Sequence, residues 1–317
     1  EPYRRQRQMC IRDSSIVEQR RVAEFIKLSE HIERVNKELL TYKETPEDHL
    51  IGITSGFKEL NKYSNGFQKE NMIVLAARPS VGKTALALNF ALTAAKYTEK
   101  TVAFFSLEMA GDLLAKRMLA IESKVNLSNI TRGYLTKDDR IRIKEASKRL
   151  SSLKLYIDDT PSIKMNDLIA KARKLQNSQN DLAMIVIDYI GLITSSEKHG
   201  GDYNRQLEVS DYSRKIAKIL LTELDGITSS KGILVIATTN YRAALPPALM
   251  RSGRMDKRIT VDMPDSYSRE AIFKYYLDKH ESLSDIDSKT LAIKTSNFSG
   301  ADIKTLINET IIDCASC

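Results

Sequence analysis

The sequence of 317 residues has no tryptophan and only three cysteines. The absence of tryptophan excludes nothing. Three cysteines in a chain of this length do not make a disulfide framework, which indicates a reducing compartment. No apolar run reaches the roughly 20 residues that a membrane-spanning helix needs, and no charged-then-apolar signal occupies the N-terminus. We therefore expect a cytoplasmic protein without a membrane partner.

The composition is that of a globular protein. Hydrophobic residues make up 42% and charged residues 28% of the chain. At 317 residues, the chain is long enough for one large domain or two ordinary ones. The formal net charge is +8, so polyanionic partners are compatible with it. Because this excess is mild, it does not establish that the chain binds nucleic acid.

The most informative segment reads ARPSVGKT. It follows an apolar run at 72–76 and precedes a helical pattern at 85–96, which is the strand–loop–helix context of a P-loop. The backbone N–H groups of such a loop wrap phosphate oxygens, and Lys83 can reach the β- and γ-phosphates of ATP while the Thr84 hydroxyl binds Mg²⁺. The alternative is a strand–helix turn with a chance Lys-Thr pair. The predicted nucleotide-binding residues are Ala77, Arg78, Pro79, Ser80, Val81, Gly82, Lys83 and Thr84, of which Ala77 stands where the usual pattern has glycine.

Five apolar segments predict strands, at 72–76, 102–106, 155–158, 184–188 and 233–238. Helical or loop sequence separates them, and this alternation is typical of a parallel sheet with helices on both faces. After residue 265 the strand pattern stops. The last three segments, 268–279, 288–295 and 300–315, predict a small helical bundle. We therefore expect an α/β P-loop NTPase that is followed by a helical lid.

The N-terminal segment has two parts. Residues 4–14, RRQRQMCIRDS, look like the translation of a sequencing adaptor, and the alternative is a basic arm that binds nucleic acid. Between 16 and 42, apolar residues recur at helical spacing and predict an amphipathic helix, whose stripe can pack on its own domain or dock on a neighbouring subunit. The stripe consists of Phe25, Leu28, Ile32, Val35 and Leu39. A linker follows at 45–48.

Hydrolysis at a P-loop also needs a carboxylate that supports Mg²⁺ and a base that orients the attacking water. Asp188 ends the apolar run 184–187, which is the Walker B arrangement. Tyr189 follows it, whereas ATPases of the AAA type have a glutamate there. Glu108 instead follows the strand 102–106 and is the candidate base. The alternative for Glu108 is a surface residue that caps the next helix.

Short motifs follow one another between residues 51 and 218. They are Gly56-Phe57 with Leu60, Gly66-Phe67, ARPSVGKT, Ser106-Leu107-Glu108-Met109, YIDDTP at 156–161, Ile187-Asp188-Tyr189, Asn204-Arg205-Gln206, Glu208-Val209-Ser210 and Ser213-Arg214. In order and spacing they resemble the motor domain of DnaB-type replicative helicases. The resemblance implies a RecA-like ATPase in a homohexameric ring, which hydrolyses ATP with Mg²⁺ to move along single-stranded DNA. It further implies 5′-to-3′ unwinding during DNA replication, with replication proteins such as primase as candidate partners.

The same resemblance assigns roles to residues. Glu108 would activate water, Asp188 would support the metal, and Lys83 with Thr84 would hold the nucleotide and Mg²⁺. The loop at 194–205 would face the channel of the ring, where Lys198 and Arg205 would meet DNA phosphates; the alternative is a solvated polar loop. The chain departs from the family at Gly191, where a glutamine is usual.

Different motifs appear after residue 219. They are LLTELDG at 220–226, ATTN at 237–240, PAL at 247–249, RSGRMD at 251–256 and FSGAD at 298–302. These resemble the second half of an AAA ATPase, most closely of the FtsH-like group. The resemblance implies that Asn240 is a polar sensor near the γ-phosphate. It also implies that Arg251 and Arg254 are fingers that reach a neighbour's nucleotide, rather than two arginines in a Pro/Gly-rich turn.

The change of resemblance, together with the adaptor-like start, favours an artificial join in sequence assembly over an evolved hybrid. We expect an artefactual tail at 1–14, an amphipathic helix and linker at 15–50, a P-loop ATPase core at 51–265 and an AAA-like helical lid at 266–317. The expected function is that of an ATP-dependent replicative DNA helicase. The alternatives are an FtsH-like unfoldase ATPase and a chimeric nucleotide-binding protein without turnover.

Overall fold

The computed structural model describes residues 27–40, 50–69, 71–193, 232–240, 257–279, 283 and 285–315. The internal contacts divide the chain into two units, Glu1–His49 and Leu50–Cys317. In the first unit, helix α2 (Leu28–Leu39) confirms the predicted amphipathic helix over the described residues. Its apolar stripe, Leu28, Ile32, Val35 and Leu39, is exposed. Residues 16–26 of the predicted helix, with Phe25, lie outside the described part of the chain.

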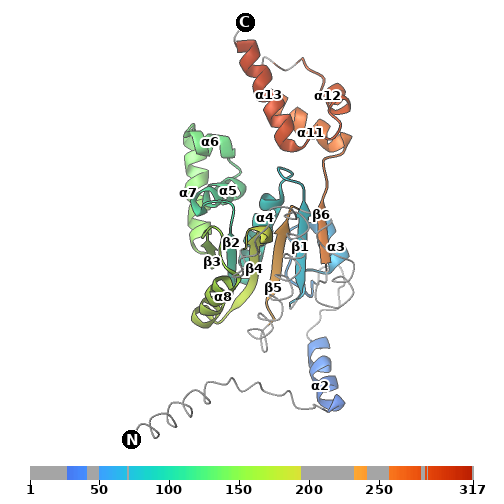
Figure 1. Cartoon of the computed structure of the whole chain (residues 1–317), viewed down its shortest axis with the longest axis vertical. Coiled ribbons are helices and arrows are strands. Elements are labelled where there is room, and N and C mark those ends of the chain that lie inside the picture. Colours follow the sequence, from blue (N-terminus) through green and yellow to red (C-terminus); the bar gives the residue numbers. More distant parts are fainter. Residues whose placement is uncertain are drawn as a thin grey trace, which may run out of the picture. The chain divides into compact units, whose positions relative to one another are not determined.

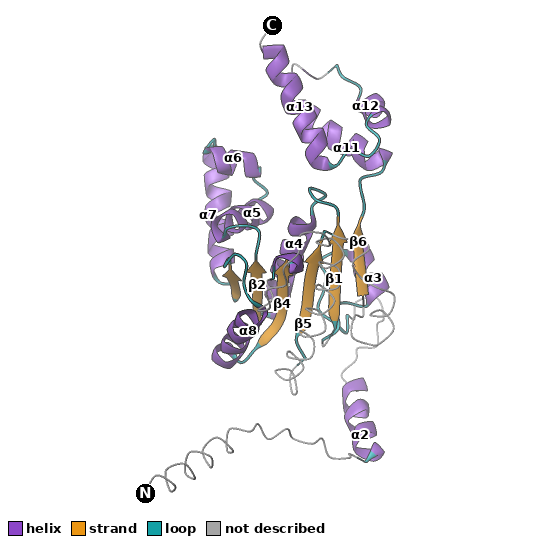
Figure 2. Ribbon diagram, in the orientation of Figure 1, coloured by secondary structure: helices purple, strands orange, loops and turns teal. Residues whose placement is uncertain are grey.

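The second unit is built on a six-stranded parallel sheet, whose arrows run side by side in one direction in Figure 2. The order across the sheet is β3-β2-β4-β5-β1-β6. The strands are β1 (Met72–Ala77), β2 (Thr101–Ser106), β3 (Leu155–Asp158), β4 (Leu182–Asp188), β5 (Leu234–Thr239) and β6 (Lys257–Val261). They can be followed along the chain in Figure 1.

The first five strands confirm the segments that the sequence predicted. Strands β1, β2, β4 and β5 are buried throughout, as long apolar runs indicate, whereas β3 is a partly exposed strand at the other edge of the sheet from β6. Strand β6 was not predicted from the sequence. This strand reads KRITV, pairs only with β1 at the edge of the sheet and has no fully buried residue. An edge strand of this kind lacks the apolar run that reveals a central strand.

Helices cover both faces of the sheet, as the sequence predicted. On one face, helix α4 (Lys83–Thr98) packs against strand residues such as Leu75, Phe104 and Val186. On the other face, helix α8 (Met165–Gln179) packs against Phe105, Ile187 and their neighbours. The two sets alternate along each strand, because successive side chains of a strand point to opposite faces.

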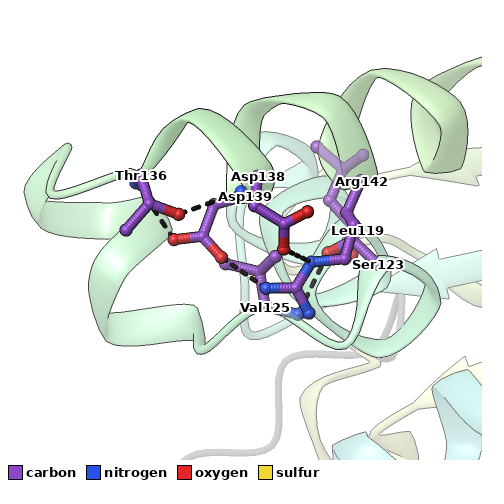
Figure 3. A network of polar contacts seen from close by, with 7 residues as sticks. All are labelled: Leu119, Ser123, Val125, Thr136, Asp138, Asp139 and Arg142. Carbon is purple, nitrogen blue, oxygen red and sulfur yellow. Dashed lines mark hydrogen bonds and ion pairs between the residues drawn. The ribbon is translucent and has the colours of Figure 1, made fainter.

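A short helix, α3 (Lys58–Ser64), precedes the sheet, and a helical excursion separates β2 from β3. The excursion consists of α5 (Gly111–Ser123), α6 (Leu127–Arg132) and α7 (Lys137–Ser151). Helix α7 begins at a capping box, in which Thr136 and Asp139 bond each other's backbone N–H groups. Arg142 pairs with both Asp138 and Asp139 from the next turn of the helix, as Figure 3 shows.

Three helices follow the sheet, as the sequence predicted: α11 (Ser266–Leu277), α12 (Ser288–Lys294) and α13 (Gly300–Ala315). They form their own apolar core, in which Phe273, Ala292 and Ile303 are fully buried. Arg269 ties α11 to the end of α12 by donating two hydrogen bonds to the carbonyl oxygen of Ala292. Among the described residues no helix is both long and apolar enough to cross a membrane.

Candidate functional site

The predicted P-loop joins β1 to α4 at the carboxyl end of the sheet. Arg78, Pro79 and Ser80 are exposed, and α4 begins at Lys83 immediately after Gly82. Gly82 has φ of +109°, a backbone conformation that suits glycine. Ala77 is fully buried as the last residue of β1. The N–H groups at the start of α4 therefore border an exposed loop, which is the arrangement that binds phosphate.

The Walker B aspartate lies against the P-loop helix. Asp188 ends β4 and is fully buried, and its Oδ2 accepts a hydrogen bond of 2.7 Å from the hydroxyl of Thr84. The Lys83 Nζ lies 3.8 Å from Asp188 Oδ1. The structure thus brings together three residues that the sequence assigned to nucleotide and metal binding.

Lys83 is a buried cation, with 6% of its side chain exposed. Burial lowers the pKa of its ammonium group, and the carboxylates of Asp188 and Glu108 oppose this shift. The Nζ also lies 4.4 Å from the centre of the Tyr189 ring, within range of a cation–π contact. Contacts within the protein therefore hold the Lys83 side chain in place without a bound phosphate.

Strand β5 contributes to the same cluster. Asn240, which directly follows β5, accepts a hydrogen bond of 2.6 Å through Oδ1 from Lys83 Nζ. Thr238 donates a hydrogen bond of 2.5 Å to Asp188 Oδ1 and is fully buried. Asn240 was assigned from the sequence, but Thr238 was not. Strand alternation could have indicated it, because residues 238 and 240 share one face of an extended chain.

Glu108 lies in the loop between β2 and α5, and its side chain is exposed. Three hydrogen bonds hold the backbone around it. The N–H of Leu107 donates to the carbonyl of Asp188 at 2.8 Å, and Ser106 Oγ donates to the carbonyl of Met109 at 2.6 Å. The N–H of Gly111 donates to Asp159 Oδ2 at 2.8 Å. The loop is thus tied to both β4 and the end of β3.

The departure at Gly191 has a physical reason in this chain. A Cβ atom at this position would lie 2.9 Å from Cε2 of Tyr189, which is too close for a real contact. The small residue therefore makes room for the ring that covers Lys83.

Four predicted site residues lie outside the part of the chain that the structure describes: Lys198, Arg205, Arg251 and Arg254. Their roles stay predictions.

A pocket of about 480 Å³ lies beside the P-loop. It is lined by Ser80, Val81 and Gly82 from the loop and by Ala271, Ile272, Tyr275, Tyr276, Gly300 and Ala301 from the C-terminal helices.

The parallel sheet, the glycine-containing loop before α4 and the Thr84–Asp188 contact define a RecA-like P-loop domain. Comparison with known proteins gives the family. Residues 52–227, more than half of the chain, match the DnaB-like helicase C terminal domain. The chain belongs to this family.

The relatives are replicative helicases. The chain is 46% identical over 179 residues to the replicative DNA helicase DnaB of Geobacillus stearothermophilus, which covers 56% of this chain and 38% of that protein. It is 45% identical over 170 residues to the replicative DNA helicase DnaC of Bacillus subtilis, covering 54% and 37%. A DnaB of Buchnera aphidicola is 35% identical over 228 residues, covering 71% and 46%. The chain thus spans less than half the length of these curated relatives.

Solved structures support the fold. An ATPase domain superimposes with a TM-score of 0.61 at 21% identity and covers 82% of this chain and 88% of its own. A DnaB-like replicative helicase, studied with primase, superimposes with a TM-score of 0.56 at 21% identity, covering 74% and 55%. At this identity the likeness establishes the fold alone.

Proposed function

We propose that this chain is the ATP-hydrolysing motor of a replicative DNA helicase, which moves along single-stranded DNA and unwinds duplex. The observation that carries the proposal is the hydrogen bond between Thr84 and Asp188, residues 104 positions apart in the sequence. It brings the Walker B carboxylate to the P-loop, beside Lys83. Membership in the DnaB-like family supports DNA as the polymer along which the motor moves.

The donor atoms fit Mg²⁺ as the metal. The Thr84 hydroxyl and the Asp188 carboxylate are hard oxygen ligands, and a P-loop needs only one or two of these, because phosphate and water oxygens complete the octahedron. Among the described residues, no three His, Cys, Asp or Glu side chains gather as a protein-only metal site. This suits a metal that is held jointly with a nucleotide. When bound, Mg²⁺ would neutralise charge on the β- and γ-phosphates of ATP.

The residues of the chain then divide the work of hydrolysis. The P-loop N–H groups and Lys83 bind the phosphates, and Asn240 senses the γ-phosphate from beside Lys83. Glu108 orients the attacking water in line with the bond to be broken and accepts its proton. The Coulombic influence of Glu108 on Lys83 supports its nearness to the phosphate site.

Partners complete the motor in this proposal. Arg251 and Arg254 reach the nucleotide of a neighbouring protomer in a homohexameric ring, and Lys198 and Arg205 contact single-stranded DNA with 5′-to-3′ polarity. The resemblance of the motifs supports these roles. A structural relative was studied for its interactions with primase, which makes primase a candidate partner here too.

We also propose that residues 4–14 are translated adaptor sequence and that residues 220–317 continue as an AAA-like segment. The division into a tail, an amphipathic helix with linker, an ATPase core and a lid follows from this. The motifs at 251–256 and 298–302 support the proposal, whereas the motif at 220–226 lies within the match to the DnaB-like family, which extends to residue 227. For the function, the comparisons favour the helicase over an unfoldase ATPase.

Rates of ATP hydrolysis with and without single-stranded DNA test the function. We expect DNA to stimulate the purified chain. Stimulation by an unfolded protein instead would support the unfoldase alternative, and nucleotide binding without turnover would support a chimeric protein whose parts do not cooperate.

Glu108→Gln tests the base. We expect turnover to fall at least about a hundredfold, since removal of a general base costs about 10²–10⁴ in rate, while nucleotide binding stays within about threefold. Asp112→Asn is the matched control, because Asp112 is an exposed carboxylate in the first turn of α5. Unchanged hydrolysis in Glu108→Gln would show that another group activates water.

A further inference from the structure

The Asp188 carboxylate is bound through both of its oxygens. Oδ2 accepts from Thr84 on α4 at 2.7 Å, and Oδ1 accepts from Thr238 on β5 at 2.5 Å. Asp188 and Thr238 are both fully buried. Hydrogen bonds to an ionised acceptor are stronger than those between neutral groups, and burial spares them the competition of water. Thr238 is therefore a principal partner of this carboxylate.

The sheet places Thr238 there. Strands β4 and β5 are parallel neighbours, with Ile187 paired to Ala237, so the next residues, Asp188 and Thr238, lie side by side at the carboxyl end. Ile187 and Ala237 belong to the α8 side of the core. Alternation along each strand therefore turns Asp188 and Thr238 to the opposite side, where α4 and Thr84 lie.

The contact restricts how the carboxylate turns. The χ2 torsion of an aspartate has broad, roughly two-fold preferences, so its side chain does not by itself fix the carboxylate plane. With Thr238 on Oδ1, the plane is fixed and Oδ2 stays directed at Thr84. Thr84 and Asp188 are the residues through which the proposed function holds Mg²⁺.

We propose that Thr238 is a positioning residue for the metal site: its hydroxyl holds Asp188 so that the Asp188 and Thr84 oxygens are presented together to Mg²⁺. This inference rests on the proposed function, since it takes Asp188 as the metal-supporting carboxylate. Thr238 acts through Asp188 and need not touch nucleotide or metal.

The test is the Mg²⁺ dependence of nucleotide binding. A fluorescent, non-hydrolysable ATP analogue is titrated onto the full chain at a series of Mg²⁺ concentrations and in excess chelator. We expect Thr238→Val to raise the Mg²⁺ concentration for half-maximal enhancement of binding about tenfold, which corresponds to the loss of one hydrogen bond to a charged group. Binding in chelator should be unchanged, and Thr238→Ser, which keeps the hydroxyl, should stay within about twofold of the parent.

Thr101→Val is the matched control. Thr101 is also a fully buried threonine, and its hydroxyl donates a hydrogen bond of 2.5 Å to an aspartate, Asp181. This pair, however, lies at the amino ends of β2 and β4. Both valine variants lose the same kind of bond, so a general loss of stability would affect them alike in thermal melts. Only T238V should change the Mg²⁺ dependence. If T238V melts below the assay temperature, Thr238→Ala is compared with Thr101→Ala in the same way.

Asp188→Asn separates the two proposals. If D188N leaves the Mg²⁺ dependence unchanged, the proposed role of Asp188 fails, and the inference about Thr238 fails with it. If D188N shifts the dependence but a folded T238V or T238A does not, the role of Thr238 alone is overturned. In the D188N background, T238V should add no further shift, because its route to the metal has been removed.

Discussion

Single residues around Lys83 stabilise its buried ammonium group. Its ammonium group has an amide oxygen at 2.6 Å from Asn240 and a carboxylate oxygen at 3.8 Å from Asp188. The ring of Tyr189 covers it. These contacts offset the cost of burying a charge. Gly191 belongs to the same arrangement, because it leaves room for the ring.

A substitution at Gly191 should therefore act through Tyr189. Gly191→Gln introduces the residue that is usual in the family, and its Cβ would meet the Tyr189 ring at 2.9 Å. We expect the free energy of unfolding to fall by about 1–3 kcal/mol, as for other overpacked sites. Urea denaturation measures it. In a Tyr189→Ala background the same substitution should cost much less, and an equal cost in both backgrounds would contradict the explanation.

At the level of elements, the loop between β2 and α5 carries Glu108 and is fixed at both ends. Asp159, which directly follows β3, accepts the bond from Gly111, the first residue of α5. Ala110 at the cap position makes no side-chain cap bond. The residue after β3 thus supplies the cap that the helix lacks, and the same contact fixes the end of the loop that carries Glu108.

Removing this cap should lower turnover without changing affinity. We expect Asp159→Ala to reduce kcat about threefold to tenfold, since one hydrogen bond is worth about 0.5–1.5 kcal/mol, with KM for ATP unchanged. Asp159→Asn keeps an acceptor oxygen and should retain most of the rate. Asp158→Asn is the control, because Asp158 bonds Lys171 and Thr160 instead. Steady-state kinetics measure both constants. A change in KM without a change in kcat would contradict the proposed role of Asp159 in positioning the loop that carries Glu108.

Helix α7 allows a test of local stability. Thr136 forms the capping box with Asp139 (Figure 3), so Thr136→Ala should lower the free energy of unfolding by about 1 kcal/mol. Thr131→Ala in α6 is the comparison, because the Thr131 hydroxyl donates to the carbonyl of Leu127 within its own helix. If the two variants have equal denaturation midpoints, the cap contributes nothing measurable.

For the whole molecule, the exposed stripe of α2 bears on assembly. Leu28, Ile32, Val35 and Leu39 are each at least half exposed. Apolar stripes of this kind mark surfaces that pack against other protein. In the proposed ring, we expect the stripe to dock on a neighbouring subunit; packing on its own domain is the other alternative that the sequence left open.

Charges in the stripe should then weaken assembly. We expect the pair Ile32→Glu and Val35→Glu to lower the oligomeric fraction at a given concentration, as measured by analytical ultracentrifugation. The control pair, Arg34→Gln and Lys37→Gln, changes the net charge by the same two units on other faces of α2. Assembly that survives the glutamates unchanged would rule out this use of the stripe.

Much of the fold could be predicted from the sequence, because its signals are local. The apolar runs located five strands, and the helical patterns located α2, α4 and the three C-terminal helices. Edge strand β6 was not predicted, because it is short and begins with two charged residues. Lys83, Thr84, Asp188 and Asn240 were recognised from short motifs, and the structure brings them together. The assigned roles of these residues stay predictions.

By itself, the sequence determined that a phosphate-binding loop stands between a buried strand and a helix, since that motif is contiguous in the chain. Only the tertiary structure decided which strands are neighbours. The order β4-β5-β1 places Thr238 against Asp188, 50 positions earlier in the chain. Such contacts depend on the pairing of distant strands, and no pattern within one segment specifies which strand will lie beside it.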